Sequence, residues 1–552
     1  MPIFSTRCAA HGLILFMPSL VFADQLQAAQ LTVNTLDDVV INDGQCSLRE
    51  AIEAANTDAD FSDCVGDGAY GSDRIEFSVA GTIAISPELD ITDSLTIDGT
   101  NQIALDGGDT NRIFSGQGEG LELRLSGLEM INGFDEQSTG GGCIRMFGSG
   151  VLLEIQDSRF QFCRVINTGI SASFGGAITI GRSPGIEPLQ TADPGNRGGQ
   201  QPSRLDIART AFLNNRAESD LNQAAGGAIQ AGPDPMEIRI EDARFLANFA
   251  QSFDPRGRPA AGGGLFVDEA INLFINRTEW SFNGAVSTAS DSFGGGISIE
   301  TQTGPALIQN STISQNQAFS AGTDSEARGG GLYARITSQD DVLSLNNNTI
   351  VRNRTRAGSG AQARSGGIEI AAGLSNLANT ILANNVAVDE SDPDNPVPSD
   401  CLPDSLLQSL GYNLIKTNCG LSAAPGDQFG VDPMLDELAE NGGPIEGMLS
   451  HLPRVNSPAL DAGNPAPVQQ FQPVGEVRAC QPVDQRLLPR PVDAIGGPIC
   501  DVGAIEVQGG QIEPAVPVPG FSRWGLIVLT IMLLLVLIGH QRKDDWQRTR
   551  QS

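Results

Sequence analysis

The segment Gly294-Gly295-Gly296-Ile297-Ser298-Ile299 places small residues before an alternating apolar run, and the chain repeats this pattern from Gly140 to Val386. Aligning one glycine from each copy gives steps of 34, 51, 36, 32, 35 and 36 residues. The aligned positions are Gly142, Gly176, Gly227, Gly263, Gly295, Gly330 and Gly366. The long step contains a Pro- and Gly-rich insertion, roughly Gly181 to Ser203. A period in the thirties with loops of variable length is typical of a solenoid.

The residues within each copy predict strands. Apolar and polar residues alternate with a period of two, and no helical stripe runs through the repeat. A second alternating segment follows, as in Leu205-Asp206-Ile207, and leads to an aromatic residue or Ile and usually to an Asn three residues later. Short strands joined by Gly- and Asn-rich turns suit parallel coils that stack on one another. The sequence therefore predicts an all-β fold, a right-handed parallel β-helix.

Three kinds of residue should stack along the axis of this β-helix. Glycine at the start of each copy suits a corner that needs positive φ or close backbone approach. Aromatic side chains should stack in the core, and Asn side chains should form an amide ladder at a fixed turn. The aromatic row is Phe160, Phe212, Phe245 and Trp280. The expected ladder is Asn215, Asn248, Asn283, Asn316, Asn353 and Asn384.

Composition limits the choice of partners. The chain has 552 residues and a formal net charge of -32, with a sequence pI near 4.3. Lys416 and Lys543 are its two lysines. So acidic a surface argues against nucleic acid and anionic membrane as partners. It permits divalent cations, or cationic and neutral glycans.

Both ends of the chain carry targeting features. Residues 1–23 predict a secretory signal peptide, with an early Arg7, an apolar region and a small-residue cleavage site at Val21-Phe22-Ala23. Gly525 to Gly539 is an uncharged apolar run followed by basic residues. At roughly 1.5 Å per residue this run is short for a bilayer core of about 30 Å, so it suits a transient membrane anchor.

Eight cysteines remain after the signal peptide, in four neighbouring pairs. The pairs are Cys46 with Cys64, Cys143 with Cys163, Cys401 with Cys419, and Cys480 with Cys500. An even count in an exported chain favours disulfides, and we infer local pairing, although sequence alone does not fix connectivity. A zinc site is the rival reading, but the chain has no Cys-x-x-Cys, and His451 is the one histidine between the terminal segments.

A short helix is expected before the first coils. Ser47 and Glu50 form a capping-box pattern, and Leu48, Ile52 and Ala55 share one helix face. Such a helix would cover the open edge and apolar end of the first coil.

Several segments resemble known bacterial surface proteins. Cys46-Ser47-Leu48-Arg49-Glu50-Ala51 matches the CSLREA segment that opens many secreted β-helix proteins. Three motifs are similar to the choice-of-anchor Q domain: residues 457–463, residues 484–490 and residues 501–506. Residues 518–525 resemble the IPTL-CTERM sorting signal of Gram-negative bacteria, with Gly520 and Phe521 where that signal has Thr and Leu.

This resemblance implies that the protein is exported and displayed on the cell surface. It does not imply any particular substrate. It implies sorting by an exosortase-type enzyme through Pro519, Trp524 and Gly525, with transient membrane attachment by the C-terminal segment. The resulting organisation is a signal peptide (1–23), an N-terminal cap with first coils (24–139), β-helix repeats (140–400), a C-terminal cap with the anchor-like domain (401–507), a linker (508–519) and a sorting segment (520–552).

Two strand rows on the outside of the β-helix are candidates for chemistry. The first row is Arg145, Thr179, Gln230, Phe266, Ser298, Tyr333 and Glu369. The second row is Glu154, Asp206, Arg239, Phe274, Leu307 and Ser344. A glycosidase needs two facing carboxylates, and a lyase needs a base with acidic cation ligands. Glu154, Asp206 and Arg239 are the catalytic candidates, although adjacent carboxylates such as Glu154 and Asp206 more often belong to a solvated strand face than to a catalytic pair.

Binding without catalysis is the favoured reading. Phe266, Phe274 and Tyr333 are candidates for a platform that stacks sugar rings, unless they merely pack beneath loops. The acidic loop from Asp389 to Asp394 could hold Ca²⁺, but it lacks the spacing of a known calcium loop, and no cofactor or metal is expected. We expect a non-enzymatic surface protein that contacts polysaccharide, host or matrix. The alternatives are a polysaccharide lyase or hydrolase, and an inert spacer.

Overall fold

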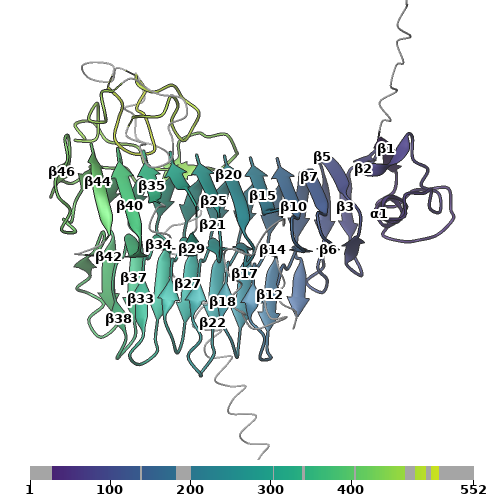
Figure 1. The fold of residues 1–552 in the computed structure, drawn as a ribbon, viewed down its shortest axis with the longest axis horizontal. Coiled ribbons are helices and arrows are strands. Elements are labelled where there is room, and N and C mark those ends of the chain that lie inside the picture. The colour runs from purple at the N-terminus through teal and green to yellow at the C-terminus, as the bar shows by residue number, and fades with distance from the viewer. Residues whose placement is uncertain are drawn as a thin grey trace, which may run out of the picture.

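The structure, a computed structural model, describes residues 28–136, 140–181, 201–302, 304–337, 342–402, 406–466, 479–492 and 499–508. These residues form a parallel β-solenoid whose strands lie side by side along its long axis (Figure 1). The predicted signal peptide and the sorting residues Pro519, Trp524 and Gly525 lie outside the described residues. Within the described ranges, no helix is long and apolar enough to cross a membrane.

One coil shows the path of the chain. It runs through β18 (Ala224–Ala225), β19 (Ile229–Ala231), β20 (Met236–Glu241), β21 (Arg244–Leu246) and β22 (Phe249–Ser252). Each of these strands pairs in parallel with the equivalent strand of the next coil. Because the coils keep the same register, each strand position generates a row of stacked side chains.

The rows build four sheets. The first sheet contains β4 (Leu89–Ile91), β6 (Phe114–Gln117), β9 (Ile144–Phe147), β14 (Ile178–Gly181), β19, β24 (Leu265–Val267), β29 (Ile297–Gln302), β34 (Leu332–Ile336) and β39 (Ile368–Ala372). The third sheet contains β8 (Phe134–Glu136), β12 (Arg164–Asn167), β17 (Arg216–Ser219), β22, β27 (Gly284–Ser287), β32 (Gln317–Ser320), β37 (Arg354–Ala357), β42 (Val386–Asp389) and the antiparallel β43 (Val397–Pro398). The fourth sheet contains β13 (Ser173–Phe174), β18, β23 (Ala260–Ala261), β28 (Ser292–Phe293), β33 (Glu326–Arg328) and β38 (Gln362–Ala363).

The second sheet is the largest, because most coils contribute two strands to it. It contains β1 (Ala28–Val33), β2 (Ala69–Phe77), β3 (Gly81–Ala84), β5 (Leu95–Asp106), β7 (Glu122–Ile131), β10 (Leu152–Gln156), β11 (Arg159–Gln161), β15 (Ser203–Ala208), β16 (Ala211–Leu213), β20, β21, β25 (Asn272–Asn276), β26 (Glu279–Ser281), β30 (Ala306–Gln309), β31 (Thr312–Ser314), β35 (Val342–Asn346), β36 (Thr349–Val351), β40 (Leu374–Ala378), β41 (Ile381–Ala383), β44 (Leu407–Gly411), β45 (Leu414–Ile415) and β46 (Gln428–Phe429).

The paired glycines form the corner between the fourth and first sheets. Gly226 has φ +67°, and a Cβ there would collide with the carbonyl oxygen of Ile229. A Cβ on Gly227 would collide with the carbonyl oxygen of Gly263 in the next coil. Two different constraints, a left-handed backbone and close coil stacking, therefore select the two glycines. The predicted glycine corner is confirmed.

The core is a continuous stack of apolar side chains. The ring centroids of Phe160 and Phe212 are 4.9 Å apart, those of Phe212 and Phe245 are 4.8 Å apart, and those of Phe245 and Trp280 are 3.8 Å apart. All four rings are stacked and fully buried. Replacing such a ring with alanine typically costs about 3–5 kcal/mol of stability. The predicted aromatic row is confirmed.

An Asn ladder runs along the corner between the second and third sheets. From the second rung onward, each Asn Oδ1 accepts hydrogen bonds from the backbone N–H and the side-chain amide of the preceding rung, at 2.9 to 3.0 Å. The rungs are Asn215, Asn248, Asn283, Asn316, Asn353 and Asn385. The prediction of Asn384 as the last rung is wrong, because Leu382 pairs with Ile350 and places Asn385 at the ladder position.

A second, mixed ladder follows the bend within the second sheet. Hydroxyl and amide oxygens of one coil accept backbone N–H groups from the coil before. Its continuous part consists of Thr278, Ser311, Asn348, Thr380 and Asn413. Asp427 ends this ladder by accepting the Asn413 N–H at 3.0 Å. Buried turn amides are thus satisfied by side chains of the neighbouring coil.

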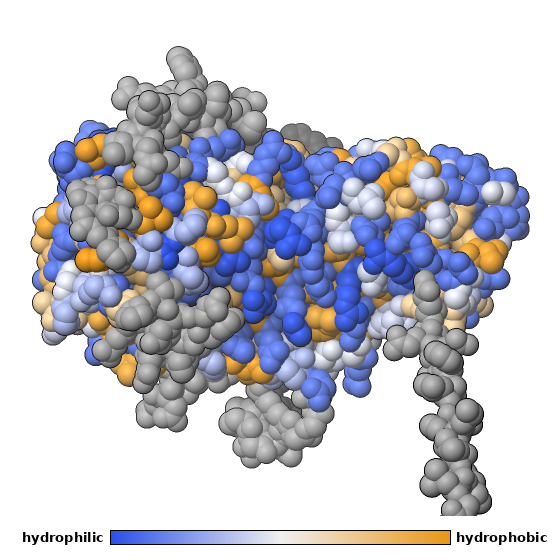
Figure 2. Space-filling view, turned by 90° about the horizontal axis from the view of Figure 1, so that it is seen from above, coloured by the Kyte–Doolittle hydropathy of each residue, from blue (hydrophilic) through white to orange (hydrophobic). Residues whose placement is uncertain are grey.

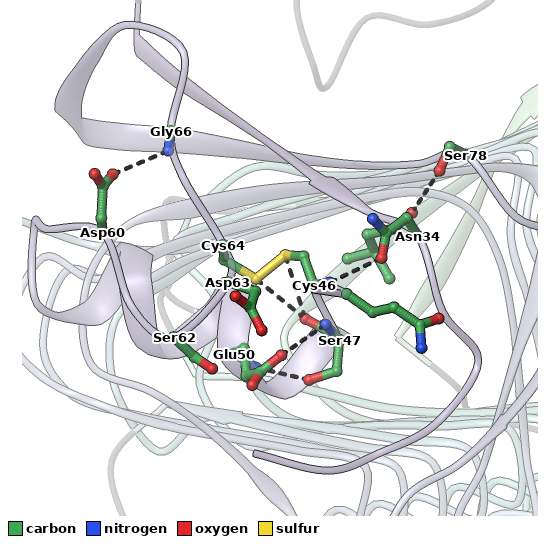
Figure 3. Close-up of a disulfide and its surroundings, with 12 residues drawn as sticks. Asn34, Cys46, Ser47, Glu50, Asp60, Ser62, Asp63, Cys64, Gly66 and Ser78 are labelled. Atoms are coloured by element: carbon green, nitrogen blue, oxygen red, sulfur yellow. Dashed lines mark hydrogen bonds between the residues drawn. A yellow bond between two sulfur atoms is a disulfide. The ribbon is translucent and has the colours of Figure 1, made fainter. Parts of the chain in front are cut away.

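A helix and a disulfide close the N-terminal end. Helix α1 (Leu48–Asn56) begins at Ser47, whose hydroxyl accepts the Glu50 N–H while the Glu50 carboxylate accepts the Ser47 N–H. Figure 3 shows this capping box beside the bond between Cys46 and Cys64. The predicted capping helix is confirmed, and it lies at one end of the solenoid beside β1 and β2 (Figure 1).

The other predicted cysteine pairs also form disulfides. Cys143 bonds with Cys163, Cys401 with Cys419, and Cys480 with Cys500. The Cys163 N–H donates to Asn215, so the second disulfide lies at the start of the Asn ladder. The third disulfide lies next to Asp400, which ends that ladder. Covalent links therefore brace both ends of the row.

The residues after β46 return along the flank of the solenoid, above β35 and β40 in Figure 1. They include the antiparallel pair β47 (Ala439–Glu440) and β48 (Leu449–Ser450). Leu438 and Leu449 pack with Leu213 and Leu246, and the Leu449 N–H donates to Glu279 at 2.7 Å. This segment thus packs along several coils.

Candidate functional site

The second sheet brings the three catalytic candidates into one row. Glu154 on β10 pairs with Asp206 on β15, and Asp206 pairs with Arg239 on β20. Neighbouring strands lie about 4.8 Å apart, so the three side chains are adjacent on the outer face. The predicted adjacency is therefore present in the fold.

Each of these charges already has a partner on the same sheet. Arg124 Nε lies 3.3 Å from the Glu154 carboxylate, and Arg204 Nη2 lies 2.5 Å from Asp206. Arg239 Nε donates to Glu241 at 2.7 Å. Each residue of this row is thus paired with an oppositely charged side chain on a partly exposed strand face. Such pairs generally contribute about 0–1 kcal/mol to stability, and this arrangement is typical of a solvated surface.

The three aromatic candidates lie on two different sheets. Phe274 belongs to the second sheet, where the Arg239 guanidinium lies 4.9 Å from the centre of its ring. Phe266 and Tyr333 belong to the first sheet and are separated by the strand that carries Ser298. The structure therefore does not bring all three rings into one platform.

The outer face of the first sheet is covered by the chain itself. Phe266 is 6% exposed and Tyr333 is 4% exposed. Phe266 packs in a cluster with Phe174 of the fourth sheet, and the ring of Phe293 lies 4.8 Å from that of Tyr333. The first row was expected to lie on the outside, and it does point away from the core. It is buried because the fourth sheet folds against it beyond the glycine corner.

A charged and aromatic group occupies the C-terminal half of this covered face. Arg328 donates to the Glu369 carboxylate at 2.6 Å, and its guanidinium lies 5.6 Å from the centre of the Tyr333 ring. Burial raises the pKa of Glu369, although Arg328 opposes the shift. Burial and the nearby charge of Glu300 raise the pKa of Tyr333 to about 12. These residues form a desolvated ion pair beside a neutral phenol.

Two further carboxylates extend this group and were missed from the sequence. Asp268 and Glu300 follow Phe266 and Ser298 by two positions; Asp268 lies directly after the end of β24, and Glu300 lies in β29. Burial raises the pKa of each, and the charge of Asp268 adds to the shift of Glu300 while Arg335 opposes it. Counting the alternation two residues further along each strand would have found them. Carboxyls whose pKa is raised by burial beside another carboxyl are a common feature of acid–base sites.

Two carboxylates of the acidic loop, Asp389 and Asp392, accept hydrogen bonds from residues of the same loop. The Asp389 carboxylate accepts from the backbone and hydroxyl of Ser391, and Asp392 accepts from Asn395. Among the described residues, no group of three or more His, Cys, Asp or Glu side chains is arranged to hold a metal ion.

No protein-family model, curated protein or solved structure matches the chain. The site must therefore be interpreted from its own chemistry.

Proposed function

We propose that this chain is an exported, surface-displayed protein that acts in adhesion, through contact with glycan or matrix, and not in catalysis. The observation that carries the proposal is the self-pairing of the exposed charges: Glu154, Asp206 and Arg239 are all engaged by charged residues of their own sheet. A long, rigid row of this kind offers a repeated polar surface, which suits weak contact at many points.

The four disulfides support export. Disulfides persist in oxidising compartments and are rare in the cytosol. The proposed address is the surface of a Gram-negative bacterium, reached through the signal peptide and an exosortase-type enzyme acting near Pro519. This address rests on the resemblance to CSLREA, choice-of-anchor Q and IPTL-CTERM proteins. The proposed right hand of the solenoid rests on the strong general preference for right-handed connections between parallel strands.

The surface pattern is compatible with contact to glycans. Figure 2 shows hydrophilic and hydrophobic residues interspersed along one face, with hydrophilic residues gathered over its middle. Glycan sites commonly combine polar groups with small apolar patches, whereas obligate protein interfaces have larger apolar areas.

A glycan array probed with the exported protein, residues 24–508, tests this proposal. Product release should be followed in parallel by unsaturated-uronate absorbance and by reducing ends. We expect binding without turnover. Absence of binding across neutral and acidic glycans would refute the glycan part and favour a structural spacer.

A hydrolase is the second candidate, because Asp268, directly after β24, and Glu300, in β29, are close enough for the charge of Asp268 to raise the pKa of Glu300. A glycosidase uses such a pair of carboxyl groups, one as acid and the other as base or nucleophile. Any reducing-end release should then fall by at least about 100-fold in Glu300→Gln, as expected for loss of a general acid. Glu122→Gln is the control, since Glu122 lies on the second sheet and pairs with Arg124. Equal activity of both variants would exclude this assignment.

A further inference from the structure

A cavity of about 480 Å³ lies on the outer side of the third sheet, near its C-terminal end. The strands β37 and β42 form its floor, and the loop that follows β42 forms one wall. The lining residues are Arg352, Arg354, Arg356, Asn384, Val386, Val388, Glu390, Pro393 and Pro396. Neither catalytic nor aromatic candidates from the strand rows contribute to it, so the cavity is a separate feature.

Three arginines meet in this cavity, and two of them have acidic partners. Arg352 forms an ion pair with Glu437, and Arg356 Nε donates to Glu390 at 2.7 Å. Within the described part of the chain, the Arg354 guanidinium has no carboxylate partner. Its register neighbours are Gln317 on one side and Val386 on the other, so neither residue paired with it is an anion.

The charge at Arg354 is unusual in this molecule. The chain carries a formal net charge of -32, and most described arginines have a carboxylate within ion-pair distance. Desolvation and the neighbouring Arg356 lower the pKa of Arg354, while the charge of Glu390 opposes the shift, and the Arg354 side chain is exposed to the cavity. A guanidinium remains protonated in proteins despite such a shift. A bound anion would relieve the repulsion between Arg354 and Arg356, because arginine binds carboxylates with two parallel hydrogen bonds.

The remaining lining is apolar. Val386 and Val388 project from β42, and Pro393 and Pro396 come from the loop after it. The C–H face of a pyranose ring packs well against such surfaces. Asn384, which accepts from Lys416, and Glu390, which accepts from Arg356, are the uncharged and acidic polar groups of the lining. The volume suits one or two sugar rings, since pockets of about 300–1,000 Å³ hold small ligands.

We propose that this cavity binds a singly charged acidic sugar, such as a terminal uronate, with its carboxylate held by Arg354 and its ring against the two valines and two prolines. The proposal deepens the glycan contact proposed above and rests on it. A terminal residue is favoured over a polyanionic chain, because the net charge of the protein repels an extended polyanion, while Arg354, to which the described residues offer no carboxylate within ion-pair distance, can hold a single carboxylate.

Calorimetric titration of the full mature chain with D-glucuronate tests the site. D-glucose is the neutral analogue of the same ring, and sodium acetate and sodium sulfate provide the anion without the ring. The variant is Arg354→Gln, which keeps length and polarity but removes the charge. Arg159→Gln is the matched control, since Arg159 is half-exposed on the second sheet and far in sequence from the cavity.

We expect wild type to bind glucuronate, Arg354→Gln to weaken binding at least tenfold, and Arg159→Gln to leave it unchanged. Glucose should bind at least tenfold more weakly than glucuronate, and so should acetate and sulfate. No glucuronate binding by wild type, or equal loss in both variants, would overturn the site. Equal binding of acetate or sulfate would overturn the sugar assignment. A protein that binds neutral glycans on the array but not glucuronate would refute this site while leaving the proposed function intact.

Discussion

The side-chain amide of Asn385 donates to the carboxylate of Asp400 at 2.8 Å, and this contact ends the Asn ladder in a group that can only accept. The same carboxylate accepts the Asn385 N–H at 2.9 Å and the Thr417 N–H at 2.8 Å. Asp427 has the equivalent position at the end of the second ladder, where it accepts from Asn413. In each ladder, every rung donates hydrogen bonds to the rung of the next coil. The last rung donates to an Asp carboxylate, which is Asp400 in the Asn ladder and Asp427 in the mixed ladder.

Replacing Asp400 with alanine should leave the backbone N–H groups of Asn385 and Thr417 without their acceptor, while the Asn385 side-chain amide still donates to the Ile350 carbonyl. An unsatisfied buried donor costs about 1–3 kcal/mol, so we expect Asp400→Ala to lower the free energy of unfolding by about 2 kcal/mol or more. Urea denaturation followed by circular dichroism measures this loss. Asp400→Asn is the control: its amide oxygen can still accept from Asn385, as in the other rungs, and its loss should be smaller. Equal losses in the two variants would argue against the role of Asp400 as an acceptor.

The glycine corner gives a second prediction. Gly226→Ala places a methyl group against the Ile229 carbonyl at φ +67°, so we expect destabilisation by about 2 kcal/mol or more. Gly118 has ordinary backbone geometry, and a Cβ there would meet only the Leu121 side chain at 3.7 Å. Gly118→Ala should therefore change the unfolding free energy by less than about 0.5 kcal/mol. Comparable midpoints for the two variants in urea would contradict this explanation of the corner.

The bond between Cys143 and Cys163 gives a third prediction. It closes a loop with a sequence separation of 20 residues, and a loop of this size implies about 3 kcal/mol of stabilisation from the restricted unfolded chain. Cys143→Ser combined with Cys163→Ser should reduce the unfolding free energy by roughly that amount. Hydrogen exchange should increase first around Asn215, which accepts the Cys163 N–H. An unchanged exchange rate there would show that the bond does not brace the ladder.

The repeating parts of the fold were predictable because parallel stacking copies one register from coil to coil. Alternation within the strands placed Glu154, Asp206 and Arg239 in one row, and the structure pairs them in that order. The ladder prediction failed at its last rung for a local reason. Ile381 resembles the stacked residue of earlier coils, but Leu382 takes that position, so the ladder moves from Asn384 to Asn385.

The sequence pattern could not predict that the outward side chains of the first sheet are buried. Period-two alternation shows which side of a strand a residue occupies, but not what covers that side. Tyr333 is buried because Phe293 of the fourth sheet packs on it, and this contact depends on the angle at the glycine corner. The cavity at Arg354 was equally hidden, since it requires β37, β42 and the following loop to converge.

His451 connects the C-terminal flank to the solenoid in a single tautomer. Its Nδ1 lies 2.8 Å from the Asp436 carbonyl oxygen, which can only accept, so Nδ1 carries the proton. Its Nε2 therefore accepts from the Ser314 hydroxyl at 2.9 Å. Protonation of Nε2 would turn this acceptor into a donor and place a charge in a fully buried site. Burial lowers the pKa of His451 to about 4, and Arg352 adds to this shift, while Glu437, Asp436 and the Asp436 carbonyl oppose it.

The lowered pKa predicts a pH-dependent docking energy. The unfolded chain gains a proton near pH 6.5, whereas the folded chain resists it until about pH 4. The stability that this neutral imidazole contributes is therefore fully present above pH 6.5, and it is lost as the pH falls from 6.5 to about 4. Integration over the window gives about 2 kcal/mol between pH 7.5 and pH 4.5.

Comparison of wild type with His451→Gln isolates this effect. Glu279 and Glu506, whose pKa values burial raises to about 6 and about 7, titrate in both proteins and have the opposite sign. Their contribution largely cancels in the difference. We expect the stability advantage of wild type over His451→Gln to shrink by about 2 kcal/mol from pH 7.5 to pH 4.5, as measured by urea unfolding. Protection of the Leu449 N–H from hydrogen exchange, corrected for the intrinsic effect of pH on the exchange rate, should fall more in wild type than in His451→Gln; its acceptor Glu279 titrates in both proteins. A constant difference at both pH values would show that His451 does not control how the flank docks.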